Sequence, residues 1–196
     1  MLYSIKKVHF IGIGGIGMSG IAELLKNKGF LVTGSDISDS PNVQRLIDLG
    51  IHVTIGHNAE NISDSELVIY SDAIPKNNVE LKNALSKNLL VYSRARMISE
   101  IAKLNNSTVA IAGTHGKTTT TSMVGSILKA LELDPTIIVG GVVKSLESNS
   151  ALGSGDTFVV EADEYNKSLL HISPTIAVIN NIAVSYTHLR AHETDS

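Results

Sequence analysis

The chain has 196 residues, 43% hydrophobic and 18% charged, a composition that predicts a globular protein long enough for one or two domains. A net charge of −3 without any basic run argues against nucleic acid or an acidic membrane surface as a partner. No cysteine is present, which excludes disulfides and thiolate metal sites. We find no signal peptide and no apolar run of about 18 residues, so we expect a cytoplasmic protein with no membrane partner.

Short apolar runs alternate with helical patterns over residues 1–104. The connections between them are short, which is typical of a doubly wound parallel sheet in an α/β fold. The predicted strands cover residues 7–13, 31–35, 53–55, 67–70 and 89–93. The predicted helices cover residues 18–28, 42–49, 78–87 and 95–104.

A polar, turn-prone segment at residues 105–107 precedes a second series of elements. We therefore place a domain boundary there, with one domain at residues 1–104 and part of another at residues 105–182. The second series comprises predicted strands at 109–112, 136–139, 157–160 and 176–180 and a predicted helix at 118–131.

The phosphate loop, Gly-Thr-His-Gly-Lys-Thr at residues 113–118, lies between an apolar strand and a helical pattern. At such a junction backbone N–H groups hold phosphate oxygens, a lysine adds positive charge and a threonine hydroxyl ligates Mg²⁺. Ile111 stands where the usual loop has its first glycine, so this is a variant form; a threonine-rich helix start is the simpler alternative. The residues we expect to bind a nucleotide are Gly113, Thr114, His115, Gly116, Lys117, Thr118 and Thr119.

The glycine loop at residues 12–17 follows the first predicted strand and has the spacing G-x-G-x-x-G. Asp36 ends the next strand, where a carboxylate can bind a ribose hydroxyl. Taken alone, this half resembles a dinucleotide-binding domain, so an NAD-dependent oxidoreductase module is one alternative. The phosphate loop farther along favours a nucleotide-linked substrate in one domain and ATP in the other. A non-catalytic nucleotide-binding or regulatory protein is the remaining alternative.

Several motifs together are similar to those of the Mur ligase family, in collinear order over roughly residues 5–182. They are residues 9–20 around the glycine loop, Gly-Ser-Asp at 34–36, Ser-Asp-Ala-Ile-Pro at 71–75, Arg-Ala-Arg-Met at 94–97, the phosphate loop extended to residue 120, Asp-Pro-Thr at 134–136, Gly-Gly at 140–141 and Glu-Ala-Asp-Glu at 161–164. The resemblance is specific because two independent loops and an acidic motif agree.

This resemblance implies a Rossmann-like, UDP-sugar-binding domain at residues 1–104 and the first part of a phosphate-loop ATPase-type α/β domain at residues 105–182. It also implies an ATP-dependent, amide-forming ligase of peptidoglycan synthesis. With ATP and Mg²⁺, such an enzyme joins L-alanine to the carboxylate of UDP-N-acetylmuramate through an acyl phosphate. A recycling ligase that attaches a whole peptide is the alternative within the family, and the Gly-Gly-x-Gly-Met-Ser pattern at residues 14–19 favours the alanine-adding member.

The resemblance assigns catalytic roles to Lys117, which would contact the β- and γ-phosphates, and to Glu161. Glu161 and Thr118 would ligate Mg²⁺. The residues implied in binding the UDP-sugar are Gly14, Gly15, Gly17, Met18, Ser19, Ser35, Asp36, Ser71 and Arg94.

For several other polar residues, both a functional and a structural explanation remain open. Asp163 and Glu164 follow the acidic ligand directly and are either part of the site or solvated loop acids. His57 matches a family position, but a lone loop histidine is more often structural or exposed. His9 and His52 lie in or beside strands, where we expect them to pack.

Residues 183–196 have no apolar period and differ from the acidic, histidine-containing segment that the family has there. We expect this tail to be artefactual and poorly packed, with His188 and His192 not acting as metal ligands. Family members are longer and have a third domain. We therefore expect this chain alone to bind UDP-sugar weakly and ATP more weakly still, not to complete ligation, and to expose an apolar sheet edge.

Overall fold

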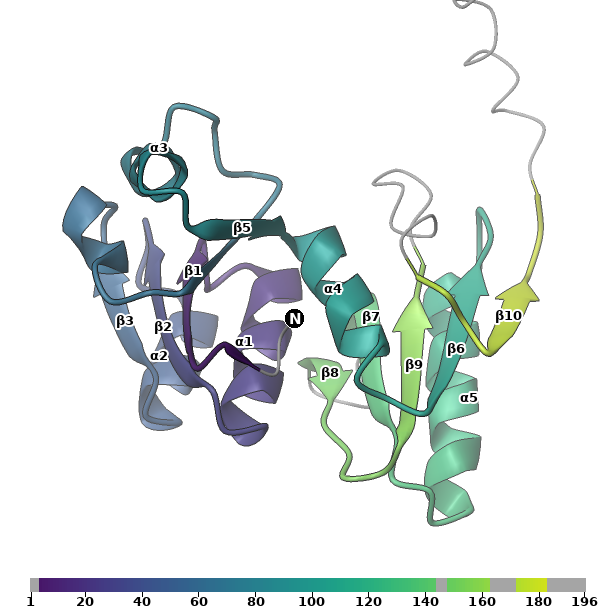
Figure 1. Cartoon of the computed structure of the whole chain (residues 1–196). Coiled ribbons are helices and arrows are strands. Elements are labelled where there is room, and N and C mark those ends of the chain that lie inside the picture. The colour runs from purple at the N-terminus through teal and green to yellow at the C-terminus, as the bar shows by residue number, and fades with distance from the viewer. Residues whose placement is uncertain (1–3, 144–147, 163–171, 183–196) are drawn as a thin grey trace, which may run out of the picture.

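The computed structural model describes residues 4–143, 148–162 and 172–182. Within these ranges the chain forms two five-stranded sheets with helices packed on them (Figure 1). The mixed α/β fold with parallel sheets that the sequence predicts is confirmed. The expectations for Asp163, Glu164 and residues 183–196 lie outside the described residues.

The first sheet is wholly parallel, with its strands in the order β3-β2-β1-β4-β5. Its strands are β1 (Lys7–Ile11), β2 (Leu31–Asp36), β3 (His52–Ile55), β4 (Leu67–Tyr70) and β5 (Leu90–Ser93). The helices that accompany it are α1 (Ile16–Asn27), α2 (Pro41–Asp48), α3 (Val79–Ser86), α4 (Arg94–Ala102) and the short 3₁₀ helix η2 (Ala59–Ile62). The chain builds outward from β1 in one direction and then from β4 in the other. Such a reversal leaves a crevice at the carboxyl ends of these two strands, where open α/β sheets bind their ligands.

The second sheet has the strand order β10-β6-β9-β7-β8. Its elements are β6 (Ser107–Ala112), α5 (Lys117–Ala130), β7 (Thr136–Val143), β8 (Ser148–Ala151), β9 (Thr157–Glu161) and β10 (Ile176–Ile179). All of its pairings are parallel except that of β8, which runs antiparallel to β7. The sequence analysis missed β8, because Ser-Asn-Ser-Ala has neither β-branched residues nor an apolar alternation.

Side-chain caps fix where the helices of the first sheet begin. Ser40 accepts the N–H of Val43 at 3.3 Å at the start of α2, and Asn78 accepts the N–H of Glu80 at 2.9 Å at the start of α3. Ser93 caps α4 in the same way. Each cap satisfies a backbone donor that has no acceptor within its helix, so these loops have defined ends beside the crevice.

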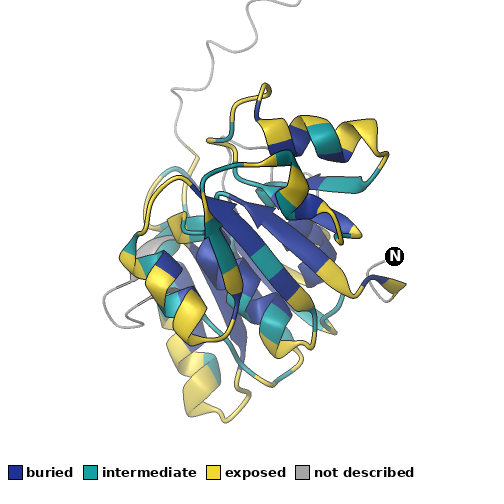
Figure 2. Cartoon of the chain, turned by 90° about the vertical axis from the view of Figure 1, so that its left-hand side faces the viewer, coloured by how far each residue is buried: buried dark blue, intermediate teal, exposed yellow. Residues whose placement is uncertain are grey.

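One apolar cluster continues from the first sheet into the second. It includes Phe10 on β1, Ile101 on α4 and Phe158 on β9, all with 0% exposure. Helix α4 runs between the two sheets (Figure 1), and at its end the Ala102 carbonyl accepts the hydroxyl of Thr108 on β6 at 3.3 Å. Figure 2 shows buried residues along the strands and exposed ones on the outer helix faces. The two sheets therefore share a core.

The edge strand β10 exposes apolar side chains, which fits the apolar sheet edge that the sequence predicts, and the outer face of α5 exposes them too. Met123 and Ile127 on α5 and Ile176 and Ile179 on β10 are each more than half exposed. None of the helices in the described ranges combines the length and apolarity needed to cross a bilayer.

Replacing Ile101 by Ala is expected to lower the free energy of unfolding by about 2–5 kcal/mol, because it leaves a cavity in the shared core. Urea titration followed by circular dichroism measures this loss, in a single transition. Ile127→Ala removes the same atoms from an exposed helix face and should cost less than about 1 kcal/mol. Equal losses in the two variants, or two separate transitions in the unaltered chain, would contradict a continuous core.

Candidate functional site

The glycine loop leaves the carboxyl end of β1 through a sharp turn. Gly12 has a φ of 79°, a left-handed conformation that favours glycine. The N–H groups of Gly12 and Ile13 both donate to the carbonyl of Ser35, at 2.8 and 3.0 Å. These bonds end β1 at Ile11, two residues earlier than the sequence predicts, and direct the chain toward α1.

A hollow of about 520 Å³ opens beside the glycine loop, where the strand order reverses. Four of the residues expected to bind substrate line it, namely Gly14, Gly15, Asp36 and Ser71. Its wall also includes Ile37, Ser38, Ser40, His57, Ile74 and Asn78. Apolar side chains combined with a few hydroxyl, amide and ring nitrogen groups are typical of a small-molecule binding site.

Asp36 connects the glycine loop to the loop that follows β2. Its Oδ2 accepts the N–H of Gly14 at 2.8 Å, and its Oδ1 accepts the N–H of Ser38 at 3.2 Å. Asn42 Nδ2 donates to the Gly14 carbonyl at 3.0 Å, so both polar backbone groups of Gly14 have partners. The carboxylate that the sequence assigns to a ribose therefore also orders the loop that would surround the ligand.

Gly17 and Arg94 lie next to each other at the start of α1. A Cβ on Gly17 would lie 2.5 Å from Nη1 of Arg94, so only glycine allows the guanidinium this position. The guanidinium therefore adds a positive charge near the first-turn N–H groups of α1, which have no acceptor within the helix. This end of the glycine loop is suited to an anion.

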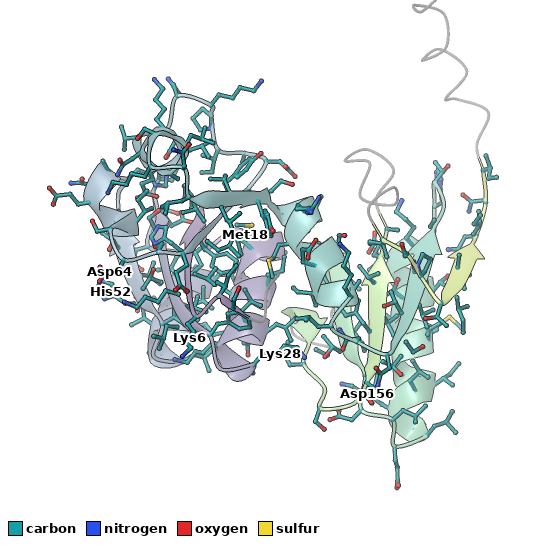
Figure 3. The ribbon with its side chains drawn as sticks, viewed as in Figure 1. Lys6, Met18, Lys28, His52, Asp64 and Asp156 are labelled. Atoms are coloured by element: carbon teal, nitrogen blue, oxygen red, sulfur yellow. The ribbon has the colours of Figure 1, made fainter. Side chains whose placement is uncertain are left out.

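Of the residues expected to bind substrate, Gly17 and Arg94 lie outside the lining of the hollow, and three others have buried side chains that do not line it either. Met18 and Ser19 are 1% exposed, because these positions of α1 face the core; Met18 is labelled in Figure 3. Ser35 is fully buried, and its hydroxyl donates to Glu80 Oε2 at 2.6 Å. Motif position alone does not distinguish a residue that lines a site from one that supports it.

Glu80 is fully buried and joins α3 to the strands beneath the hollow. Its carboxylate accepts from the Ser35 hydroxyl and from Asn61 Nδ2, each at 2.6 Å, and lies 3.5 Å from ring nitrogens of His9 and His57. Burial acts to raise the pKa of Glu80, but the His9 ring, the Ser35 hydroxyl and the Asn61 amide outweigh it and lower the pKa to about 2. The site thus rests on a buried, ionised carboxylate.

His57 connects this buried network to the hollow. The Ser35 hydroxyl donates its one hydrogen to Glu80, so it accepts from Nδ1 of His57, 3.0 Å away. His57 therefore has both a structural bond and a place on the hollow's wall. His9 is buried, as expected, whereas His52 is exposed on the edge strand β3 (Figure 3), so the expectation that it packs was wrong.

The phosphate loop leaves β6 and starts α5. Gly113 and Gly116 have φ values of 134° and 80°, and Gly116 is the N-cap of α5 without a side-chain cap bond. The first N–H groups of α5 thus remain for an anion. Lys117 is the first residue of α5, and its Nζ donates to the Gly113 carbonyl at 2.6 Å. An ammonium and a helix N-terminus therefore meet at one loop.

Thr118 and Glu161 come together at the carboxyl ends of neighbouring strands. Strand β6 pairs with β9 so that Glu161 lies opposite Ile111, and the Thr118 hydroxyl donates to Glu161 Oε2 at 2.9 Å. A hydroxyl and a carboxylate oxygen are hard ligands that suit Mg²⁺. Within the described ranges no group of three His, Cys, Asp or Glu residues could hold a metal ion. A cation held by these two oxygens would take its other ligands from phosphates and water, as Mg²⁺ commonly does.

The remaining residues expected at the nucleotide site surround this loop. His115 and Thr119 are exposed, and Thr114 is half-buried. Sequence reasoning missed the wall residues Ser38 and Asn78 of the other site. Their position in the sequence could have identified them, because each lies in a loop that follows the carboxyl end of a strand of the first sheet.

Comparison with known families matches two models to this chain. The Mur ligase family, catalytic domain, matches residues 7–106, and the Mur ligase middle domain matches residues 111–195. The first match covers the glycine loop with its hollow, and the second covers the phosphate loop and Glu161.

Curated relatives are named UDP-N-acetylmuramate–L-alanine ligase. Those of Brucella anthropi and Agrobacterium fabrum are 55% and 54% identical to this chain, over 93% and 89% of it. The chain spans only 39% and 37% of their length.

Solved structures agree with these matches. The UDP-N-acetylmuramate–alanine ligase of Thermotoga maritima is 36% identical, with a TM-score of 0.82 over 93% of this chain and 43% of its own. The UDP-N-acetylmuramate:L-alanyl-gamma-D-glutamyl-meso-diaminopimelate ligase of Neisseria meningitides is 30% identical, with a TM-score of 0.81 over 91% of this chain and 61% of its own.

Replacing Glu80 by Gln should make the free energy of unfolding less dependent on pH in the acidic range. The folded-state pKa of about 2 lies below the ordinary 4.5, so the carboxylate's contribution is complete above pH 4.5 and is lost as pH falls through 2. Across that window the unaltered chain should lose on the order of 3 kcal/mol more than Glu80→Gln, measured by urea titration at each pH. Glu132→Gln, at an exposed position, is the matched control and should follow the unaltered chain. Parallel curves for the chain and Glu80→Gln would contradict this account.

Proposed function

The chain belongs to the Mur ligase family, and on this basis we propose that it is the substrate- and nucleotide-binding part of an ATP-dependent amide ligase. In this proposal the hollow beside the glycine loop holds UDP-N-acetylmuramate and the phosphate loop holds ATP. The complete enzyme joins L-alanine to the muramate carboxylate in peptidoglycan synthesis. Relatives with that name are 54–55% identical to this chain. Among the solved structures, the alanine ligase is 36% identical and the peptide-joining ligase 30%, which also supports L-alanine over a whole peptide as the added group.

The observation that carries the proposal is the contact between Thr118 and Glu161 beside Lys117. A hydroxyl and a carboxylate oxygen 2.9 Å apart, next to an ammonium and a helix N-terminus, form a place for a magnesium-bound triphosphate. A protein that only binds a dinucleotide has no use for this arrangement. Its presence after a nucleotide-type hollow supports a reaction between two phosphorylated ligands.

The hollow beside the glycine loop offers separate groups for the parts of a UDP-sugar. Next to the hollow, the start of α1 with Arg94 beside Gly17 suits the diphosphate, because a helix N-terminus and a guanidinium both attract negative charge. The apolar side chains of Ile37 and Ile74 and the polar groups of His57 and Asn78 suit a base and its ribose.

The proposed reaction has two steps that balance without a redox partner. A carboxylate oxygen of UDP-N-acetylmuramate attacks the γ-phosphorus of ATP and ADP leaves; the amine of L-alanine then attacks the acyl carbon, phosphate leaves and the amine loses a proton. Such chemistry depends on positioning and on neutralising charge. Lys117, whose Nζ lies at the Gly113 carbonyl, would neutralise phosphate oxygens, and Thr118 and Glu161 would hold Mg²⁺. Bound Mg²⁺ supplies further charge neutralisation at the phosphates.

A matched pair of titrations tests the ligand of the hollow. Calorimetry of this chain should detect binding of UDP-N-acetylmuramate and no binding of NAD at the same concentration. Gly14→Ala should weaken the UDP-sugar by about tenfold or more, because its Cβ would lie 2.6 Å from Val43 and 3.0 Å from Asp36 and shift the loop. Tight binding of NAD without competition from the UDP-sugar would favour an oxidoreductase module instead.

A second pair tests the phosphate loop. Lys117→Ala should weaken MgATP by about 10- to 100-fold, because it removes a charged donor from the phosphates. Lys129→Ala removes the same charge from the last turn of α5 and should leave MgATP affinity within about twofold. Equal affinity of the two variants, measured by calorimetry, would contradict the nucleotide assignment.

A further inference from the structure

We propose that Asn180 and Asn181, which follow β10, are positioning residues that hold the phosphate loop in the shape that receives a nucleotide. This inference rests on the proposed function of that loop. Sequence reasoning gave neither asparagine a role, and both lie more than sixty residues beyond the loop in the chain. The inference comes from how their side-chain amides meet the loop backbone.

Asn181 binds both polar backbone groups of His115. Its Oδ1 accepts the N–H of His115 at 3.0 Å, and its Nδ2 donates to the His115 carbonyl at 3.0 Å. Only an amide side chain offers an acceptor and a donor at this spacing, as a neighbouring strand would. One exposed side chain thus fixes the orientation of the loop at its midpoint.

Asn180 adds a second contact at His115 and another on helix α5. Its Nδ2 donates to the His115 carbonyl at 3.3 Å, and its amide lies within 3.0–3.2 Å of the hydroxyl of Thr120 on α5. The pair therefore connects the middle of the loop to the first turn of the helix. The N–H groups at the start of α5 are held relative to the rest of the loop.

The two loop glycines make this approach possible. A Cβ on Gly113 would lie 3.1 Å from Cβ of Asn180 and 3.1 Å from the Asn181 nitrogen, and a Cβ on Gly116 would lie 3.3 Å from Asn180 Nδ2. Strand β10 pairs with β6 up to Ala112, whose carbonyl accepts the Asn180 N–H at 3.0 Å. The loop and the asparagines therefore follow the carboxyl ends of two neighbouring parallel strands.

The consequence is a preformed cradle. Two of the loop's residues have positive φ, so an unheld loop would sample many conformations and lose that freedom when phosphates bind. A loop already held in one conformation binds its ligand more tightly, because less ordering remains to be done. The asparagines act on nucleotide affinity through the backbone and need not touch the nucleotide.

Two measurements on the whole chain test this role. Asn181→Ala should weaken MgATP by about tenfold in calorimetry and should speed hydrogen exchange at the His115 amide in the ligand-free chain. Asn181→Asp keeps the acceptor for the His115 N–H, so exchange should stay slow, while loss of the donor and added negative charge still weaken MgATP. Asn180→Ala should weaken MgATP with a smaller effect on exchange at His115.

The matched control is Asn106→Ala. Asn106, like Asn181, is an exposed asparagine, and its side chain bonds to Asp156 at 2.9 Å. It precedes β6 and therefore lies at the opposite end of that strand from the phosphate loop. It should change neither MgATP affinity nor exchange at His115. Fast exchange at His115 in the unaltered chain, or equal MgATP affinity of the chain and Asn181→Ala, would overturn the positioning role alone. Absence of MgATP binding by the unaltered chain would overturn it together with the proposed function.

Discussion

Backbone N–H groups at the start of α1 and α5 have no acceptor within their helices, and each helix begins only a few residues after a buried parallel strand. In both loops this short passage uses left-handed backbone that favours glycine: Gly12 before α1 and Gly116 before α5 have φ values of 79° and 80°. Both candidate sites depend on this constraint. The same turn that ends the strand leaves donors for an anion.

Side chains from neighbouring strands then hold each turn in place. Around the glycine loop, Asp36 binds the Gly14 N–H and the buried Glu80 binds the Ser35 hydroxyl from below. Around the phosphate loop, the side-chain amides of Asn180 and Asn181 bind the backbone of His115. The supporting groups lie at the end of β2, on helix α3 and directly after β10, and all of them are distant in sequence from the loop that they support. Parallel pairing brings such groups to one edge.

The parallel sheets and both glycine-rich loops could be predicted from the sequence, because apolar runs and glycine spacing are local signals. Thr118 and Glu161 were predicted as a pair through family resemblance, and the structure places them in contact. Burial was harder to predict: Ser35 and Asp36 are adjacent, yet one supports the hollow from inside and the other forms its rim. Strand β8, which runs antiparallel to β7, was missed because Ser-Asn-Ser-Ala has neither β-branched residues nor an apolar alternation. Tertiary contacts of this kind leave no periodic pattern in the chain.

Helix α4 begins beside one site and ends at the strand that leads to the other. Arg94, at its first residue, rests against Gly17, while the carbonyl of Ala102, at its last, holds the hydroxyl of Thr108 on β6. Nine residues of α-helix form a rigid strut about 14 Å long. This strut therefore fixes the spacing between the backbone beside the glycine loop and the first residues of β6. The two candidate sites are held apart by a rigid helix that packs in the shared core, rather than by a flexible linker.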